Sequence, residues 1–220
     1  MTAVEAPEQK LTKKGLATRE RIVETAAQLI YAHGVQNTSN ELVREAAGVS
    51  GSQLSRHFPT KESLVKAVIA WQADLMIKTH QQSAMNMIDS FAALRRWADS
   101  FIAREELSQE GCPFGSLASE VIKSDPAIRG DVVQGFDGWV DVFRSGLRMM
   151  RERGDLSEDA DPAQLAYTLA AAFQGGMLLD QASGNAEPLR AALNGAIAYI
   201  ETFASSKALS EATAAATQRQ

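Results

Sequence analysis

Apolar residues recur at helical spacing along most of the chain, and this repeat restricts the fold more than any other feature of the sequence. In the first such segment, Ile22, Val23, Ala26, Leu29 and Ile30 fall on one face of a helix. Nowhere do Val, Ile, Thr and aromatic residues alternate over the length of a strand. The sequence therefore predicts an all-α protein.

Residues that start or stop helices divide the chain into about nine helices. Thr38 and Ser50 stand three residues before Glu41 and Gln53, which is the pattern of a capping box. Glycine or proline punctuates most of the other junctions. Helices are expected over residues 18–33, 38–47, 50–57, 60–84, 89–107, 112–124, 127–153, 161–182 and 187–205.

This arrangement predicts an N-terminal three-helix helix-turn-helix domain and a C-terminal helical domain for ligand binding and dimerisation. The expected parts are a mobile basic arm (1–17), the helix-turn-helix DNA-binding domain (18–66), the ligand-binding and dimerisation domain (67–205) and a flexible tail (206–220). One cysteine excludes a disulfide framework and a multi-cysteine zinc site. With no apolar run of about 18 residues and no signal-peptide core, a cytoplasmic protein without a membrane partner is expected.

Charge is distributed unevenly along the chain. Residues 10–66 carry nine Lys and Arg against five Glu, a net +4, whereas the whole chain carries −5. A basic N-terminal module on an acidic body favours contact between that module and a polyanion, although random variation of surface charge would give the same count.

The second and third predicted helices are joined by Ala47-Gly48-Val49, which is typical of a helix-turn-helix. The third helix presents short or hydrogen-bonding side chains outward and would fit a major groove, unless it is the solvated face of an ordinary helical hairpin. Gln53 either closes the capping box or reads a base edge, and base contact is the favoured prediction. The candidate DNA-binding residues are Lys13, Lys14, Thr38, Arg44, Ser50, Gly51, Ser52, Gln53, Ser55, Arg56, His57 and Lys61.

Residues 18–71 resemble the DNA-binding domain of TetR-type repressors. The resemblance lies in Thr18-Arg19-Glu20-Arg21-Ile22-Val23, Ala26-Ala27-Gln28-Leu29-Ile30, His33-Gly34-Val35, Thr38-Ser39, Ala46-Ala47-Gly48-Val49-Ser50 and Leu54 followed by His57-Phe58-Pro59-Thr60-Lys61-Glu62-Ser63-Leu64. It implies an all-helical homodimer with a divergent ligand-binding domain, and a phosphate contact for Lys61.

Three positions depart from this family. Ser52 stands where Gly is usual, and Ser55 replaces an aromatic residue that often touches the DNA backbone. Arg44 replaces Ala and either reaches a phosphate or lies on the surface. These changes affect which operator is read rather than whether DNA is bound.

Cys112 precedes Pro113, which suits the first position of a helix and places the thiol at the N-cap. The positive end of the helix dipole favours a thiolate there. A similar Gly-Cys-x-x-Gly segment occurs in some TetR-type regulators, and in certain of these the cysteine responds to oxidants or electrophiles. The favoured alternative is that this lone cysteine packs as a small apolar group.

Two sets of apolar residues are assigned to the C-terminal domain. A ligand pocket with few charges, suited to an apolar or aromatic effector, is predicted among residues that also supply core. The pocket candidates are Trp71, Trp97, Phe101, Cys112, Phe114, Leu117, Phe136, Trp139, Val140, Phe143, Phe173 and Met177. A dimer seam, whose alternative is packing within one chain, is predicted at Leu165, Leu169, Phe173, Leu189, Leu193, Ile197 and Ile200.

Together these features predict a ligand-responsive transcriptional repressor that binds double-stranded operator DNA as a homodimer and is released by a small-molecule effector. One alternative replaces the effector with oxidation of Cys112, and another is an all-helical enzyme or carrier. The sequence shows no catalytic pair, phosphate loop or metal-ligand spacing, so no enzymatic activity, metal or cofactor is expected.

Overall fold

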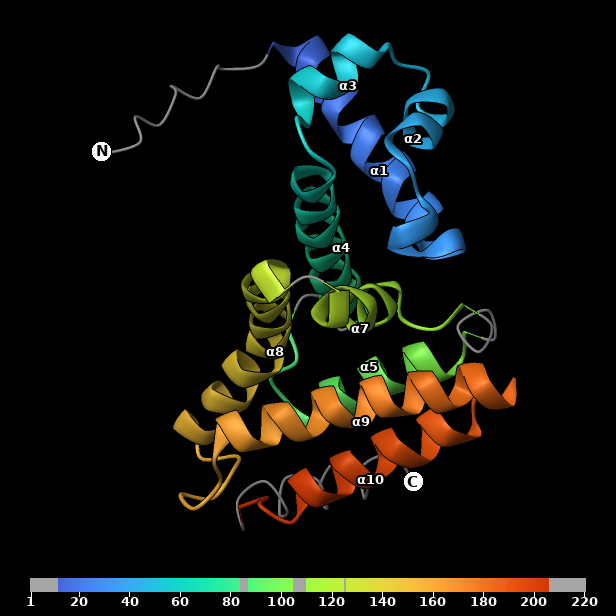
Figure 1. The fold of residues 1–220 in the computed structure, drawn as a ribbon. Helices are drawn as coiled ribbons and strands as arrows, with labels where there is room; N and C mark the ends of the chain where they lie inside the picture. The colour runs from blue at the N-terminus through green and yellow to red at the C-terminus, as the bar shows by residue number, and fades with distance from the viewer. Residues whose placement is uncertain (1–11, 84–86, 105–109, 125, 206–220) are drawn as a thin grey trace. The chain divides into compact units, whose positions relative to one another are not determined.

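The computed structural model describes residues 12–83, 87–104, 110–124 and 126–205. These residues form nine α-helices and one short 3-10 helix, with a single isolated bridge between Leu156 and Ala204. The all-α prediction is therefore confirmed. The elements are α1 (Lys13–Asn37), α2 (Asn40–Ala46), α3 (Gly51–His57), α4 (Lys61–Ser83), α5 (Phe91–Ile102), α7 (Pro113–Ser124), η1 (Pro126–Ile128), α8 (Arg129–Glu152), α9 (Pro162–Ser183) and α10 (Glu187–Glu201) (Figure 1).

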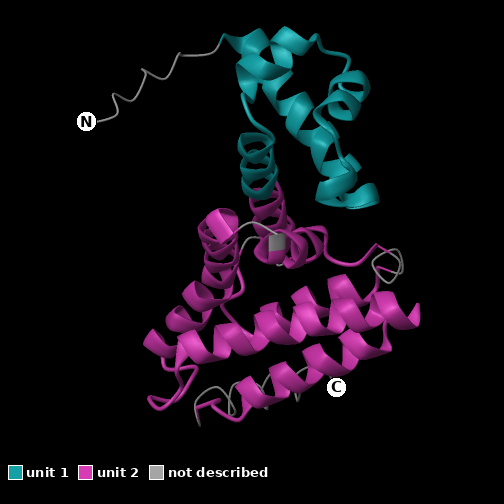
Figure 2. Cartoon of the chain, in the orientation of Figure 1, with its two compact units in different colours: residues 1–71 teal, residues 72–220 magenta. Residues whose placement is uncertain are grey.

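The chain divides into two compact units, Met1–Trp71 and Gln72–Gln220 (Figure 2). The division falls inside α4 rather than after residue 66, so this helix supplies residues to both units. None of the helices in the described ranges has both the length and the apolar composition required to cross a bilayer. The predicted tail over 206–220 lies outside the described residues.

Unit 1 is held together by apolar side chains from its short helices. Val43 of α2 and Leu54 of α3 are buried together with Ile22 and Ala26 of α1. The turn between α2 and α3 contains Gly48 at φ +61°, a conformation that favours glycine. Arg21 Nε donates to the carbonyl oxygen of Ala47 at 3.0 Å, which fixes this turn against α1.

The start of α1 differs from the sequence-based prediction. Thr12, not Thr18, is the N-cap, and its Oγ1 accepts the N–H of Gly15 at 3.2 Å. Thr18 is buried inside the helix and donates to the carbonyl oxygen of Lys14. Lys13 and Lys14 therefore lie in the first turn of α1 and are not part of a mobile arm. The rest of that predicted arm, residues 1–11, lies outside the described residues.

The capping box predicted at Thr38 is wrong. Ser39 is the N-cap of α2, and its Oγ accepts the N–H of Leu42 at 3.1 Å. Thr38 is only 3% exposed, and its hydroxyl donates to the carbonyl oxygen of Gly34 at 2.8 Å. Its burial removes Thr38 from the candidate DNA-binding surface. The second predicted box, between Ser50 and Gln53, is confirmed.

Unit 2 is built around the antiparallel pair of α9 and α10, which lie side by side (Figure 1). Helix α8 packs on α9, and α5 packs on α10. The buried Asp180 of α9 caps the first turn of α10, because its Oδ1 accepts the N–H of Leu189 at 2.8 Å. Burial raises the pKa of this carboxyl above its ordinary value, against the opposing effect of that hydrogen bond.

The segment that follows α4 is fastened to α8 at two places. Gly146 lies so close to Ile88 that an added Cβ would stand 1.9 Å from the Ile88 carbonyl oxygen. Near the end of α8, Arg153 pairs with Asp89 (Nη1 to Oδ2, 3.2 Å) and with Asp155 (Nη2 to Oδ2, 2.9 Å). These contacts hold Ile88 and Asp89, shortly before α5, against α8.

Candidate DNA-binding surface and effector site

The outer face of α3 is the candidate base-reading surface. Gly51, Ser52, Ser55 and Arg56 are exposed on it, whereas Leu54 points into the core of unit 1. Of the exposed side chains, Arg56 can donate two hydrogen bonds to a guanine edge, and the two serines are small enough to let the helix approach bases closely.

Gln53 fills the capping role that competes with base reading. The N–H of Ser50 donates to Gln53 Oε1 at 2.8 Å, and the N–H of Gln53 donates to Ser50 Oγ at 3.2 Å. Base contact was the favoured prediction, but in this structure the amide oxygen is engaged by the helix terminus. The amide nitrogen Nε2 is the atom left to face a base.

The basic residues of unit 1 differ in how firmly they are held. Arg44 pairs with Glu41 (Nη2 to Oε1, 2.5 Å) and Glu45 (3.3 Å), so a phosphate contact would require exchange of these partners. Lys61 is half-buried, and its Nζ donates to the carbonyl oxygen of Gln36 at 3.4 Å. Lys13 and Lys14 are exposed.

His57 is half-buried at the end of α3, and its Nε2 is buried without a hydrogen-bond partner. Burial, together with the positive charges of Arg56 and Arg19, lowers the pKa of this imidazole. His57 therefore stays neutral at pH 7 and contributes no fixed positive charge to the surface.

Most of the predicted pocket residues are buried against one another in unit 2. The aromatic cluster, as we call it, consists of His80, Trp97, Phe101, Trp139, Phe143 and Phe173, none of them more than 4% exposed. Phe114, Leu117, Val140 and Met177 are buried as well, and Phe136 is half-buried with its ring 4.8 Å from that of Phe114. Trp71 belongs to unit 1.

His80 occupies the middle of this cluster. Its ring stacks on Phe101 at 4.6 Å and meets Phe173 at 4.7 Å and Trp139 at 5.1 Å. Its Nδ1 accepts the indole N–H of Trp97 at 3.0 Å. Burial lowers the pKa of His80 to about 3, with a smaller contribution from Arg104, so the imidazole is neutral with its proton on Nε2.

The sequence-based prediction did not include His80 or Gln72 among the site residues. Both lie on the buried stripe of α4 that also contains Ile69, Ala73 and Met76, and both are buried. A polar residue at an inward position of an apolar stripe was the signal that would have singled them out.

Cys112 lies at the start of α7, as predicted, and is half-buried. Its Sγ accepts two hydrogen bonds, each at 3.4 Å, from the N–H of Gly115 and from Nε2 of Gln174. The thiol therefore acts as the cap of α7 and is joined to α9. It is neither a fully buried apolar group nor a freely exposed one.

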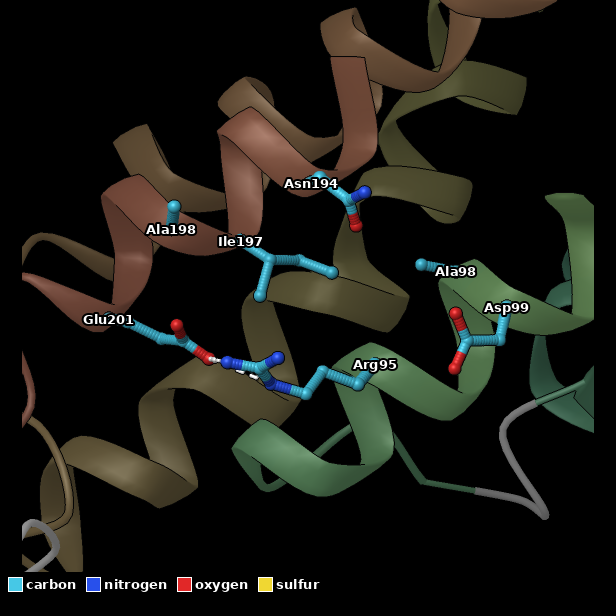
Figure 3. Close-up of a pocket in the computed structure, with 7 residues that line it drawn as sticks. All are labelled: Arg95, Ala98, Asp99, Asn194, Ile197, Ala198 and Glu201. Atoms are coloured by element: carbon cyan, nitrogen blue, oxygen red, sulfur yellow. Dashed lines mark hydrogen bonds and ion pairs between the residues drawn. The ribbon is translucent and has the colours of Figure 1, made fainter. Parts of the chain in front are cut away.

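Two hollows in unit 2 lie away from the aromatic cluster. One, of about 270 Å³, follows the contact between α4 and α8 and is lined by Ile77, Gly138 and Val142, among others. The other, of about 310 Å³, lies between α5 and α10; Figure 3 shows the Arg95–Glu201 ion pair at one side of it and Asp99 with Asn194 at the other. Within the described residues, no group of three His, Cys, Asp or Glu could hold a metal ion.

The predicted dimer seam needs correction. Leu165, Leu169, Phe173, Leu189, Leu193, Ile197 and Ile200 are each at most 4% exposed within the single chain. They pack α9 and α10 against each other and against the rest of unit 2, because the apolar stripe of each helix faces its own core. The exposed apolar residues of these helices are instead Tyr167, Leu178, Leu179 and Tyr199.

A helix-turn-helix with an outward polar α3, followed by a separate helical unit with an aromatic core, defines a DNA-binding transcriptional regulator. Two family profiles match the chain: "Bacterial regulatory proteins, tetR family" over residues 22–68 and "Tetracyclin repressor-like, C-terminal domain" over residues 90–196. The chain belongs to the TetR family.

Individual relatives agree with this assignment. The transcriptional repressor DhaR of Mycobacterium sp. (strain GP1) is 27% identical over 175 residues, which cover 78% of this chain and 86% of DhaR. An uncharacterized regulator encoded in the lacX 3′ region of Lactococcus lactis is 30% identical over 171 residues, covering 74% and 82% of the two chains. A TetR regulator from Chloroflexus aurantiacus superposes with a TM-score of 0.75 at 25% identity, covering 88% and 99%.

Proposed function

We propose that this regulator represses transcription by binding operator DNA as a homodimer, and that a small apolar or aromatic effector in unit 2 releases it. The main support for this proposal is that α3, the exposed helix predicted to contact bases, and the buried aromatic cluster belong to different compact units. Helix α4 contributes residues to both, so it is the element through which the two activities are coupled.

Release is a shift between two conformations. The effector binds more tightly to the conformation in which α4 no longer holds the two reading helices at the spacing of the operator half-sites. Its effect on repression equals the ratio of its affinities for the two conformations, so tight binding alone is insufficient.

The dimer is supported by the outward faces of α9 and α10. Leu178 and Leu179 are 66% and 57% exposed, and they lie beside Gly175, where an added Cβ would meet no atom within 4 Å. On α10, Gly195 is equally open and lies one turn before the exposed Tyr199. Small residues beside large exposed apolar side chains favour close packing against the same helices of a second copy.

Electrophoretic shift on DNA directly upstream of the protein's own gene tests this function. Specific, salt-dependent binding that a small aromatic metabolite reverses would support it, whereas equal affinity for all sequences would contradict it. Arg56→Ala should cost about 1–3 kcal/mol on the preferred operator and relax its sequence preference. Lys14→Ala is the matched control, because it should weaken all sequences alike and lower the salt slope by about one unit.

We further propose a second mode of release, by oxidation or alkylation of Cys112; it is supported by the half-buried position of this residue and by its hydrogen bond from Gln174. Modification of Sγ would remove the cap of α7 and its link to α9. If this mode operates, hypochlorite releases DNA from the wild type but not from Cys112→Ala, and Cys112→Ala still binds the operator. Equal release from both proteins would exclude it.

A further inference from the structure

The aromatic cluster contains a hydrogen-bond donor that no protein acceptor meets. Trp139 is 1% exposed, yet its indole Nε1–H has no partner. In the same cluster, the indole N–H of Trp97 is bonded to His80. Burying an unpaired N–H is unfavourable, since it loses its hydrogen bond to water and gains none in exchange.

An unpaired acceptor is buried on the facing helix. Gln72 of α4 is 5% exposed, and its Oε1 also has no partner. The buried stretch of α4 faces α8 closely, because an added Cβ on Gly135 would lie 3.0 Å from Ala73 Cβ and one on Gly138 would lie 3.2 Å from Ile77 Cδ1. Two helices in contact therefore bury unsatisfied polar atoms of opposite kind, an acceptor at Gln72 on α4 and a donor at Trp139 on α8, and α8 also buries the unpaired donor Arg144 Nε.

The six side chains of the aromatic cluster carry no formal charge. His80 is neutral, and the other five members of the aromatic cluster are aromatic hydrocarbons or indoles. Arg104 lies at the edge, with its guanidinium 4.9 Å from the Phe101 ring centre and one N–H donated to Ser83 Oγ. A ligand among the rings would therefore meet ring faces and two neutral hydrogen-bonding groups, and it would meet the cation Arg104 only at the edge of the cluster.

We propose that the effector is an uncharged aromatic compound with an oxygen that accepts the Trp139 Nε1–H and an N–H or O–H that donates to Gln72 Oε1. This rests on the proposed function, because it names the chemical class of ligand for the same helical unit. A site with buried polar groups discriminates strongly against analogues that leave them unpaired. A hollow of about 270 Å³ between α4 and α8 adjoins this part of the unit; Gly138 lines it, whereas Trp139 and Gln72 do not.

The test compares three probes of similar size on the full chain. Benzamide offers both an acceptor and a donor, ethylbenzene offers neither, and benzoate is charged; their dissociation constants are measured by ligand-detected NMR titration at millimolar concentrations. Trp139→Phe should weaken benzamide about tenfold, the loss of one buried hydrogen bond, and leave ethylbenzene unchanged. Gln72→Met should act in the same direction, and benzoate should not compete with benzamide.

Trp97→Phe is the matched control, because its indole N–H is already used by His80. It should leave the ratio of benzamide to ethylbenzene affinity unchanged. Thermal unfolding gives an independent readout: both variants should lower the midpoint because each loses buried ring area, but Trp97→Phe should lower it further because it also removes the bond to His80. An equal decrease of the unfolding midpoint in the two variants would contradict the inference that Trp139 Nε1 has no hydrogen-bond partner.

The inference and the proposed function fail in different ways. If benzamide does not bind, or if its affinity relative to ethylbenzene survives Trp139→Phe, the inference is overturned whatever happens to DNA. If the preference exists and disappears in Trp139→Phe, the inference stands. If benzamide and larger amide derivatives bind but do not release operator DNA, the proposed function, repression controlled by an effector, is contradicted.

Discussion

At the scale of single residues, His80 makes the stability of unit 2 depend on pH. Its pKa in the folded chain is about 3, whereas an unfolded histidine titrates near the ordinary 6.5. Above pH 6.5, His80 is neutral in both the folded and the unfolded chain, so its titration does not change the free energy of unfolding. Below pH 6.5, His80 is protonated in the unfolded chain but stays neutral in the folded chain. The free energy of unfolding should therefore fall by about 1.4 kcal/mol per pH unit towards pH 3.

Urea unfolding at pH 7, 6 and 5 measures this slope. His80→Gln removes the titrating group but keeps an acceptor for the Trp97 N–H, so the wild type should lose stability faster than this variant as the pH falls. His33→Gln is the control, because His33 is exposed and the slope should not change. The same slope in His80→Gln and in the wild type would assign the acid sensitivity to other groups.

Gln53 is the residue at which helix stability and DNA reading compete. Because it closes the capping box, Gln53→Ala should cost about 1 kcal/mol of stability. Gln53→Glu keeps the box, since Glu serves equally well at that position, but it brings a carboxylate to the phosphates and should abolish operator binding. Thermal melts and operator titrations of both variants separate the two roles. If Gln53→Ala leaves the melt unchanged and relaxes sequence preference, reading is its main role.

At the scale of elements, the contact between α8 and the segment after α4 depends on a missing side chain. A Cβ at Gly146 would lie 1.9 Å from a backbone oxygen that cannot rotate away, so Gly146→Ala should destabilise unit 2 by about 1–3 kcal/mol. Gly130 lies on the same helix with open space around it, and Gly130→Ala should stabilise by about 0.5–1 kcal/mol. Opposite shifts in the urea midpoint are expected, and a shift of the same sign in both would contradict the close approach.

Helix ends that depend on a few adjacent residues were predicted correctly, whereas those that depend on packing were not. The Ser50–Gln53 box and the start of α7 after Cys112 were predictable because each depends on a few adjacent residues. The starts of α1 and α2 were misplaced because neighbouring hydroxyl residues compete as caps, and only packing decided that Thr18 and Thr38 are buried. The register of a helix end is therefore set partly by contacts that sequence spacing does not contain.

Helical periodicity also could not assign a partner to an apolar stripe. Leu193 and Ile197 were correctly placed on the apolar face of their helix, but that face meets the same chain rather than a second copy. For the same reason, Trp139 was recognised as an aromatic pocket residue, while its unpaired Nε1 and the buried, unpaired Oε1 of Gln72 were missed. The contribution of a polar residue depends on which atoms surround it in three dimensions.

At the scale of the whole molecule, dimerisation is predicted to use the outward faces of α9 and α10. Leu178→Glu adds charge to a side chain that is 66% exposed in the single chain, so the fold should tolerate it. In the dimer the same carboxylate would be buried against apolar groups, at a cost large enough to separate the subunits. Light scattering after size exclusion should therefore show a monomer, and its circular dichroism should show the same helix content as the wild type.

Two comparisons make the dimer prediction specific to this face. Val133→Glu also charges an exposed apolar residue, 50% exposed on α8, and should leave the dimer intact. Leu193→Glu charges a fully buried position and should unfold unit 2 rather than yield a folded monomer. Because two half-sites are read together, the folded Leu178→Glu monomer should also lose most of its operator affinity while keeping its affinity for benzamide. A Leu178→Glu protein that remains dimeric and binds the operator normally would place the interface on another surface.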